Sequence, residues 1–174
     1  MKLQQTIKNI ATTSILIALI FITTFLLKIP YGGGMGYFNF SDGLIIFFSI
    51  TFNPFISITS SIIGTALSDL ASGYIEFILP TIVAKGLESL FVYLLFRFFK
   101  ENKYLKYLTF IIPPLIMVLV YFISYLILFN INFSYLSSIF DLIQGFIGVI
   151  ISISLVTVFS HTNFKIFKEK LKYF

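Results

Sequence analysis

The chain has no cysteine, a single histidine (His161) and little charge. Without cysteine there is no disulfide and no thiol chemistry, and one histidine is too few for the usual zinc or haem ligand sets. Carboxylates alone remain as candidate metal ligands. No nucleophile and base stand in a recognisable arrangement, so we expect no enzyme activity, no cofactor and no metal site.

Charged residues are 11% of the 174 residues, whereas hydrophobic residues are 58%, and the mean hydropathy is +1.00. This composition excludes a soluble domain and predicts an integral membrane protein. The net charge of +5 does not indicate a nucleic-acid partner, because the lysines fall at the ends of apolar segments, where they meet the membrane surface. We find no second domain or repeat, so residues 1–174 are expected to form one membrane domain.

Apolar runs predict an all-α fold with six transmembrane helices. The first run follows lysines, as in a signal peptide, but it is long enough to span and no small-residue cleavage site follows, so we interpret it as a retained helix. The second has only about 10 to 12 residues, and at about 1.5 Å per residue it is too short to cross a core about 30 Å thick. The predicted helices cover residues 10–29, 43–52, 55–72, 77–99, 105–129 and 136–160.

Basic residues set the predicted orientation. Threading six segments places three basic clusters on one side of the membrane, and five or seven segments would split them. By the positive-inside rule this side is cytoplasmic, so both termini are expected in the cytoplasm. The residues of the three clusters are Lys2, Lys8, Arg97, Lys100, Lys103, Lys106, Lys165, Lys168, Lys170 and Lys172.

Residues 30–42 join the first two helices, and their glycines prevent a regular helix. We interpret this segment as a mobile loop or lid. Its aromatic residues either stack on a ring-shaped ligand or anchor the loop at the membrane interface. These candidate lid residues are Tyr31, Tyr37, Phe38 and Phe40.

Polar side chains are expected to converge in the outer half of the membrane domain. An ionisable group at a bilayer centre costs about 2.5 to 3.5 kcal/mol on insertion scales, so such groups usually face a cavity or a partner. Their convergence predicts a pocket that is open to the exterior and closed toward the cytoplasm. The converging residues are Asp42, Asp69, Lys85, Glu88, Asp141 and Gln144.

Each of these residues also has a structural interpretation. Lys85 and Glu88 share a helix face and can neutralise each other, as an ion pair that only orients helices. Asp69 can be a carboxylate near the membrane surface at a helix end. Asp141 can cap the N-terminus of the sixth helix, although it also begins a polar and small-residue stripe with Gln144.

Small residues recur along the first helix at Ala11, Ser14 and Ala18. This spacing lets another helix approach closely. The face serves either packing within the protein or docking of another membrane subunit.

Three motifs resemble the substrate-binding S components of energy-coupling factor (ECF) vitamin transporters. They are GYFNFSDG at residues 36–43, SDLASGY at 68–74 and PTIVAKGL at 80–87. The resemblance covers nearly the whole chain, through its length, six spans, small-residue first helix and basic tail. It is greatest to the branch assigned to hydroxymethylpyrimidine, pyridoxine and riboflavin.

The resemblance implies a transmembrane coupling subunit and two cytoplasmic ATPase subunits as partners, and a multi-pass protein of the bacterial plasma membrane. In this family the first helix docks the coupling subunit, which matches Ala11, Ser14 and Ala18 here, although Ser14 departs from a strict alanine pattern. The loaded S component is implied to topple in the membrane to release its ligand inside. ATP is hydrolysed by the partners and not by the S component.

Our leading hypothesis is a binding subunit for a water-soluble vitamin or precursor, with hydroxymethylpyrimidine or pyridoxine favoured and riboflavin as a further candidate. The converging polar residues would donate and accept hydrogen bonds, while Asn39 and the lid aromatics close over the ring. The alternatives are an ion-coupled secondary carrier that uses Asp69 or Glu88 as a proton site, and a membrane assembly subunit without a small-molecule ligand.

Overall fold

The computed structural model describes residues 2–32, 36–161 and 171–174, so Lys165, Lys168 and Lys170 of the basic tail lie outside the described residues. Helices dominate the described part, as the apolar runs predict. The elements in chain order are α1 Lys2–Leu26, β1 Ile29–Tyr31, β2 Gly36–Phe38, α2 Asp42–Thr51, α3 Pro54–Ser72, the 3-10 turn η2 Ile75–Phe77, α4 Ile78–Phe99, the 3-10 turn η3 Leu105–Tyr107, α5 Leu108–Leu128 and α6 Ile131–Ser160.

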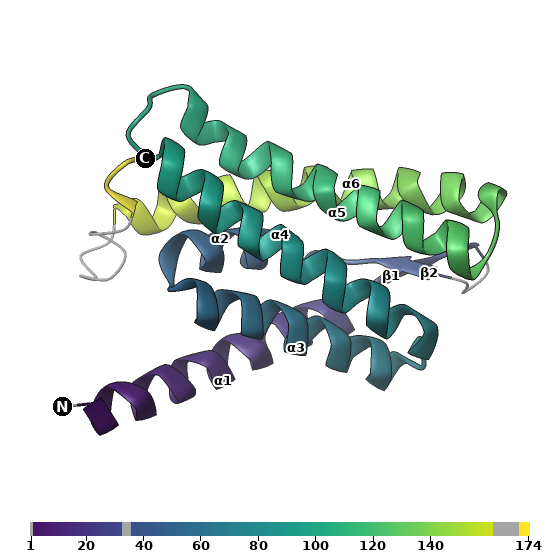
Figure 1. Ribbon diagram of the computed structural model, residues 1–174, viewed down its shortest axis with the longest axis horizontal. Coiled ribbons are helices and arrows are strands. Elements are labelled where there is room, and N and C mark those ends of the chain that lie inside the picture. Colours follow the sequence, from purple (N-terminus) through teal and green to yellow (C-terminus); the bar gives the residue numbers. More distant parts are fainter. Residues whose placement is uncertain (1, 33–35, 162–170) are drawn as a thin grey trace.

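Five helices are long and apolar enough to cross a membrane: α1, α3, α4, α5 and α6. They form an arc in which α1 packs on α3, α3 on α4, α4 on α5 and α5 on α6. The described parts of both chain ends lie at the same end of this arc as the turn before α5 (Figure 1). This agrees with an even number of crossings, with α2 and the segment before it counted as one crossing.

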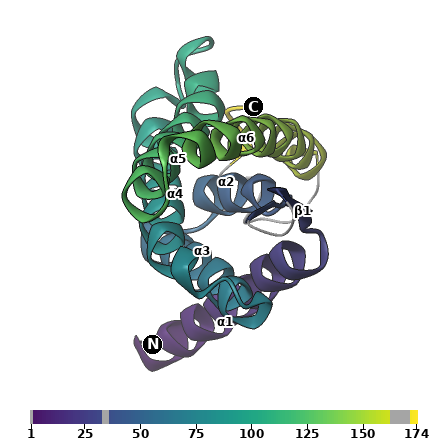
Figure 2. The ribbon, with the colours of Figure 1, turned by 90° about the vertical axis from the view of Figure 1, so that its right-hand side faces the viewer.

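The short helix α2 lies inside the arc (Figure 2), where it contacts α6, α4 and α3. All but one of its ten residues are buried. Ten residues rise about 15 Å, half of a hydrocarbon core. Because α2 is surrounded by protein, it does not need to span the bilayer by itself.

The segment before α2 forms an antiparallel hairpin, β1–β2, in which Pro30 pairs with Tyr37 and Tyr31 with Gly36. As expected, the described part of this segment forms no regular helix before α2, whereas the two strands were not predicted; residues 33–35 between them lie outside the described residues. Aromatic residues favour strands, which the glycine count obscured. The hairpin lies at the opposite end of the bundle from the chain termini (Figure 1), and α2 continues from it toward the termini.

Local signals explain where the helices begin and end. Asn53 accepts a hydrogen bond from Ile56 N at 2.9 Å and caps α3. At the other end of α3, Gly73 has a φ of 81°, the left-handed conformation that suits glycine after a helix. Asn130 caps α6 in the same way by accepting from Phe133 N at 2.9 Å.

Two glycines bring α2 against α6. A Cβ atom on Gly148 would lie 2.7 Å from Asp42 Cβ, and a Cβ atom on Gly43 would collide with the Ile151 side chain. The close approach of α2 and α6 is therefore possible only because glycine has no side chain at these two positions. This approach fixes the position of Asp42 within the bundle.

Candidate ligand-binding cavity

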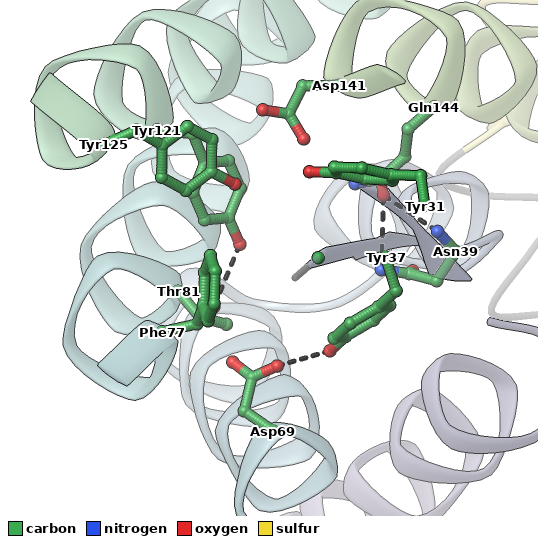
Figure 3. Close-up of a pocket in the computed structure, with 11 residues that line it drawn as sticks. Tyr31, Tyr37, Asn39, Asp69, Phe77, Thr81, Tyr121, Tyr125, Asp141 and Gln144 are labelled. Atoms are coloured by element: carbon green, nitrogen blue, oxygen red, sulfur yellow. Dashed lines mark hydrogen bonds between the residues drawn. The ribbon is translucent and has the colours of Figure 1, made fainter. Parts of the chain in front are cut away.

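A cavity lies between the hairpin and the ends of α3, α4, α5 and α6 near it (Figure 3). The cavity volume is about 20 Å³, roughly the room that one water molecule needs. The cavity is thus narrow in this structure, and a ring-shaped ligand needs its walls to move apart. Its wall is formed by Tyr31, Gly36, Tyr37, Asn39, Asp69, Phe77, Thr81, Tyr121, Tyr125, Asp141 and Gln144.

The hairpin is attached to two different helices. Tyr37 Oη donates a hydrogen bond to Asp69 Oδ1 on α3. On the other side, Asn39 N donates to Gln144 Oε1 on α6 at 2.8 Å. Burial raises the pKa of the Tyr37 phenol far above its ordinary value, so the hydroxyl remains a proton donor. These two hydrogen bonds hold the hairpin across the cavity.

Tyr31 supports the hairpin through a ring contact. Its ring stacks on Phe140 of α6 with 4.2 Å between the centroids. The ring also leaves no room for a side chain at Gly36, where a Cβ atom would lie 2.8 Å from the Tyr31 hydroxyl. Burial raises the pKa of the Tyr31 phenol as well.

Two buried carboxylates face each other across the cavity (Figure 3). Asp69 of α3 is 1% exposed and Asp141 of α6 is 3% exposed. The Oδ2 atoms of both have no hydrogen-bond partner among the described residues. Nearly all buried polar atoms in proteins are hydrogen-bonded, so these two oxygens are exceptions to be explained.

Helix α5 contributes tyrosines that were absent from the predicted site. Tyr121 Oη donates to Thr81 Oγ1 at 3.1 Å, and Tyr125 packs edge-on against Phe77 at a centroid distance of 5.7 Å. Met117, Tyr121 and Tyr125 are buried and lie four residues apart along one face of an otherwise mostly aliphatic helix. That spacing is the sequence signal that would have identified them.

A charged network lies behind the cavity wall. Lys85 donates to Asp42 Oδ1 and, at 3.2 Å, to Glu88 Oε2. Gln144 Nε2 donates to the second oxygen of Asp42 at 2.9 Å. The side chains of Lys85 and Glu88 are almost fully buried, and neither lines the cavity.

The predicted polar residues therefore fall into two groups. Asn39, Asp69, Asp141 and Gln144 line the cavity, whereas Asp42, Lys85 and Glu88 pair with one another behind it. Gln144 belongs to both groups, because its amide connects Asn39 to Asp42.

The predicted lid residues are also divided. Tyr31 and Tyr37 line the cavity. Phe38 instead stacks against Phe140 at 6.2 Å, and Phe40 meets the edge of Phe38 at 6.0 Å. These two phenylalanines hold the hairpin in place from outside the cavity.

One structural alternative is wrong. Asp141 does not cap α6, because that helix starts at Ile131 with Asn130 as its cap and places Asp141 in its third turn. The run of apolar and serine residues before Asp141 continues the helix, which was predicted to begin five residues later. Asp69 does lie near the end of α3, as its structural alternative has it, but its side chain is almost completely buried there.

The small-residue face of α1 is not covered by another helix of the described structure. Ala11, Ser14 and Ala18 are exposed, while Leu16 and Ile20 are buried on the side of α1 that packs on α3. At about 100° per residue, the small residues lie opposite the buried ones. Within the described part of the chain, these three residues therefore do not serve packing against α3.

A metal site is not apparent in the described ranges 2–32, 36–161 and 171–174. No three histidine, cysteine, aspartate or glutamate side chains in these ranges gather closely enough to hold an ion. The cavity chemistry is instead that of hydrogen bonding and ring stacking, with carboxylate acceptors and aromatic faces.

The fold and the cavity define a polytopic helical membrane protein with a narrow cavity lined by polar and aromatic side chains. The family described as "ECF-type riboflavin transporter, S component" matches residues 4–161. This match covers most of the chain, so the protein belongs to that family. It is thus a multi-pass membrane protein of a transporter class and not of an enzyme class.

Comparisons with curated proteins and with solved structures add no information on function. An archaeal protein from Pyrococcus woesei, described as "Uncharacterized protein in gap 3'region", is 37% identical over 71 residues. The match covers 41% of this chain and 47% of that protein, so this chain corresponds to about half of its relative's length. No solved structure matches significantly.

Proposed function

We propose that this protein is the substrate-specific binding subunit of an ATP-driven importer for a water-soluble vitamin or vitamin precursor. It captures its ligand from outside and delivers it to the cytoplasm together with an energy-coupling module. Hydroxymethylpyrimidine or pyridoxine is the favoured ligand, and riboflavin, which the family description names, is the alternative.

The observation that carries this proposal is the cavity behind the hairpin. It combines aromatic walls with a small number of polar groups, the usual make-up of a small-molecule site. A single ring needs less movement of the cavity walls than the three fused rings and sugar-alcohol chain of riboflavin. The hairpin is held by hydrogen bonds and ring contacts of its side chains, and we propose that it opens to admit a ligand and closes over it.

Family membership and the open face of α1 support the coupling module. We propose that Ala11, Ser14 and Ala18 contact a transmembrane coupling subunit, which in turn carries two cytoplasmic ATPase subunits. The exposed side of α1 has small residues where a second helix can approach closely. The basic end of the bundle faces the cytoplasm under the positive-inside rule, which is the side where the ATPases work.

Ligand binding is tested with the purified chain. Native mass spectrometry identifies any small molecule that co-purifies, and titration calorimetry with hydroxymethylpyrimidine, pyridoxine and riboflavin then measures its affinity. We expect one of them to bind with a Kd below about 1 μM, which corresponds to about −8 kcal/mol. An empty protein that binds none of these vitamins contradicts the proposal.

Coupling is tested in proteoliposomes. Ala11→Leu, Ser14→Leu and Ala18→Leu are expected to abolish ATP-dependent uptake with the coupling module and to leave ligand affinity unchanged. Ala71→Leu, at an exposed position on α3, is the matched control and should transport normally. Uptake by the chain alone, without ATP or partners, identifies an ion-coupled carrier instead.

A further inference from the structure

The two unpartnered oxygens of the cavity indicate what its ligand must offer. Asp69 Oδ2 and Asp141 Oδ2 belong to side chains that are 1% and 3% exposed. Thr81 hydrogen-bonds to the first carboxyl group and Tyr125 to the second, but the Oδ2 atom of each has no partner among the described residues. A buried acceptor without a donor costs free energy. A ligand that donates a hydrogen bond to it removes this cost, which makes binding more favourable.

Several donors of the cavity wall are already engaged. The Tyr37 hydroxyl donates to Asp69, and the Tyr121 hydroxyl donates to Thr81. The Gln144 amide is oriented by the hydrogen bond that it gives to Asp42. The wall also carries the hydroxyls of Tyr31, Thr81 and Tyr125. The need for a ligand with hydrogen-bond donors therefore comes from the two unpartnered carboxyl oxygens and not from a lack of donors in the wall.

The wall also lacks a positive charge. None of its described residues is a lysine or arginine. Lys85 lies behind the wall and is matched by two carboxylates, Asp42 and Glu88. An anionic ligand would meet two carboxylates without a compensating cation, whereas a cationic or neutral ligand would not be repelled.

The aromatic residues define the shape of the ligand. Tyr31, Phe77, Tyr121 and Tyr125 present ring surfaces to the cavity (Figure 3). Flat rings stack on such surfaces, and cations are attracted to the faces of the rings. The two aspartates lie on opposite sides of this aromatic space (Figure 3).

We propose that the cavity selects a neutral or cationic planar heterocycle that carries hydrogen-bond donors on two opposite edges, one for Asp69 Oδ2 and one for Asp141 Oδ2. Phosphorylated forms of the same heterocycle are rejected. This inference rests on the proposed function as a vitamin-binding subunit, and it narrows the substrate to amino-bearing or similarly donor-rich rings.

Two matched pairs of probes test this inference on the wild-type chain. The first pair is 2,5-diaminopyrimidine and 2,5-dimethylpyrimidine, which place amino donors or methyl groups at the same two opposite ring positions. The second pair is pyridoxamine and its phosphate ester. We expect the diamine to bind at least about 10-fold more tightly than the dimethyl compound, and the ester at least about 10-fold more weakly than pyridoxamine.

Variants then assign the effect to the two carboxylates. Asp69→Asn and Asp141→Asn should each weaken binding of 2,5-diaminopyrimidine by about 10- to 100-fold, because each replaces one of the two carboxyl groups that accept from its amino groups. Glu76→Gln changes an exposed carboxylate outside the cavity and should leave this affinity unchanged. The wild-type comparison does not depend on whether the variants fold.

The outcomes separate this inference from the proposed function. If 2,5-dimethylpyrimidine binds as tightly as 2,5-diaminopyrimidine, or the phosphate ester as tightly as pyridoxamine, the donor-rich inference is wrong while vitamin binding stands. The same holds if a vitamin binds and both aspartate variants retain full affinity. If neither these probes nor the vitamins bind, both proposals fail.

Discussion

Two carboxylate-rich regions lie side by side in this bundle, and they treat their charges differently. In the network behind the cavity, Lys85 binds both Asp42 and Glu88, and only Glu88 Oε1 is left without a partner. On the cavity wall, Asp69 and Asp141 each keep an oxygen free, and no cation stands between them. The charged groups of the first region pair with one another, whereas the second region keeps two oxygens that a ligand could bind.

The comparison teaches that a buried charge is not by itself a sign of ligand contact. Lys85 is the most conspicuous charge of the sequence, yet its donors are directed to its own neighbours. A buried ion pair contributes little to stability against an apolar replacement, but losing one partner leaves the other uncompensated. The two regions should therefore respond in opposite ways to substitution, the network through folding and the cavity wall through binding.

The largest expected effect comes from removing the single cation of the network. Lys85→Met leaves Asp42 and Glu88 buried without it, which should lower the free energy of unfolding by about 3 to 5 kcal/mol. Thermal unfolding in detergent measures the loss. The triple variant Asp42→Asn, Lys85→Met, Glu88→Gln neutralises the whole network and should recover much of the stability. A triple variant no more stable than Lys85→Met would show that the network is not a coupled unit.

A smaller effect is expected where α2 approaches α6. Gly148→Ala places a methyl group 2.7 Å from Asp42 Cβ, so the helices must separate at a cost of about 1 to 3 kcal/mol. Gly86→Ala is the matched control, because its new atom meets the flexible end of Ile62 at 3.1 Å and should cost less. Thermal unfolding of both variants checks the difference, and equal losses would contradict the role of close α2–α6 packing in placing Asp42.

The hairpin is connected to Asp69 of the cavity wall through the Tyr37 hydroxyl. Removing this hydroxyl should loosen the hairpin at the cavity and leave the charged network unaffected. Tyr37→Phe removes the hydrogen bond to Asp69 and should weaken hairpin attachment by about 1 kcal/mol. Backbone amides of β2 should then exchange with deuterium about fivefold faster, while those of α2 are unchanged. Tyr104→Phe, at an exposed position far from the hairpin, is the control. Unchanged exchange in β2 would mean that other contacts hold the hairpin.

The smallest effect concerns pH. Burial raises the pKa of Tyr37 above the ordinary value of 10.0, so the unfolded chain releases this proton at a lower pH than the folded chain does. The stability contributed by the neutral phenol is fully present below about pH 10 and declines as pH rises toward the folded pKa, by at most about 1.4 kcal/mol per pH unit. Tyr37→Phe should therefore lose less stability than the wild type between pH 10 and 11. Denaturant titrations at both pH values measure this, and parallel losses would contradict it.

Much of the fold followed from local patterns. The apolar runs predicted five of the six helices to within about five residues at each end, and they identified a second helix too short to span, whereas α1 begins at Lys2, eight residues before its predicted start. The stripe that begins with Asp141 and Gln144 on the sixth helix was also predicted, and both residues are buried on one face of α6. Such features repeat with the period of a helix, so the sequence itself contains them.

The hairpin, the pairing of charges and the tyrosines of α5 were decided by the tertiary structure. Asp42 and Lys85 are 43 residues apart, and Asn39 and Gln144 are 105 apart, so no local spacing could pair them. Two short strands gain stability only from the helices around them.

The sequence alone determined that this protein is a helical membrane protein with several ionisable groups where charge is costly, because hydropathy and helical period are local properties. Only the tertiary structure decided which of those groups neutralise one another and which remain unsatisfied at the cavity. The physical reason is that hydrogen bonds and ion pairs act over a few ångströms, and packing of distant segments sets those distances.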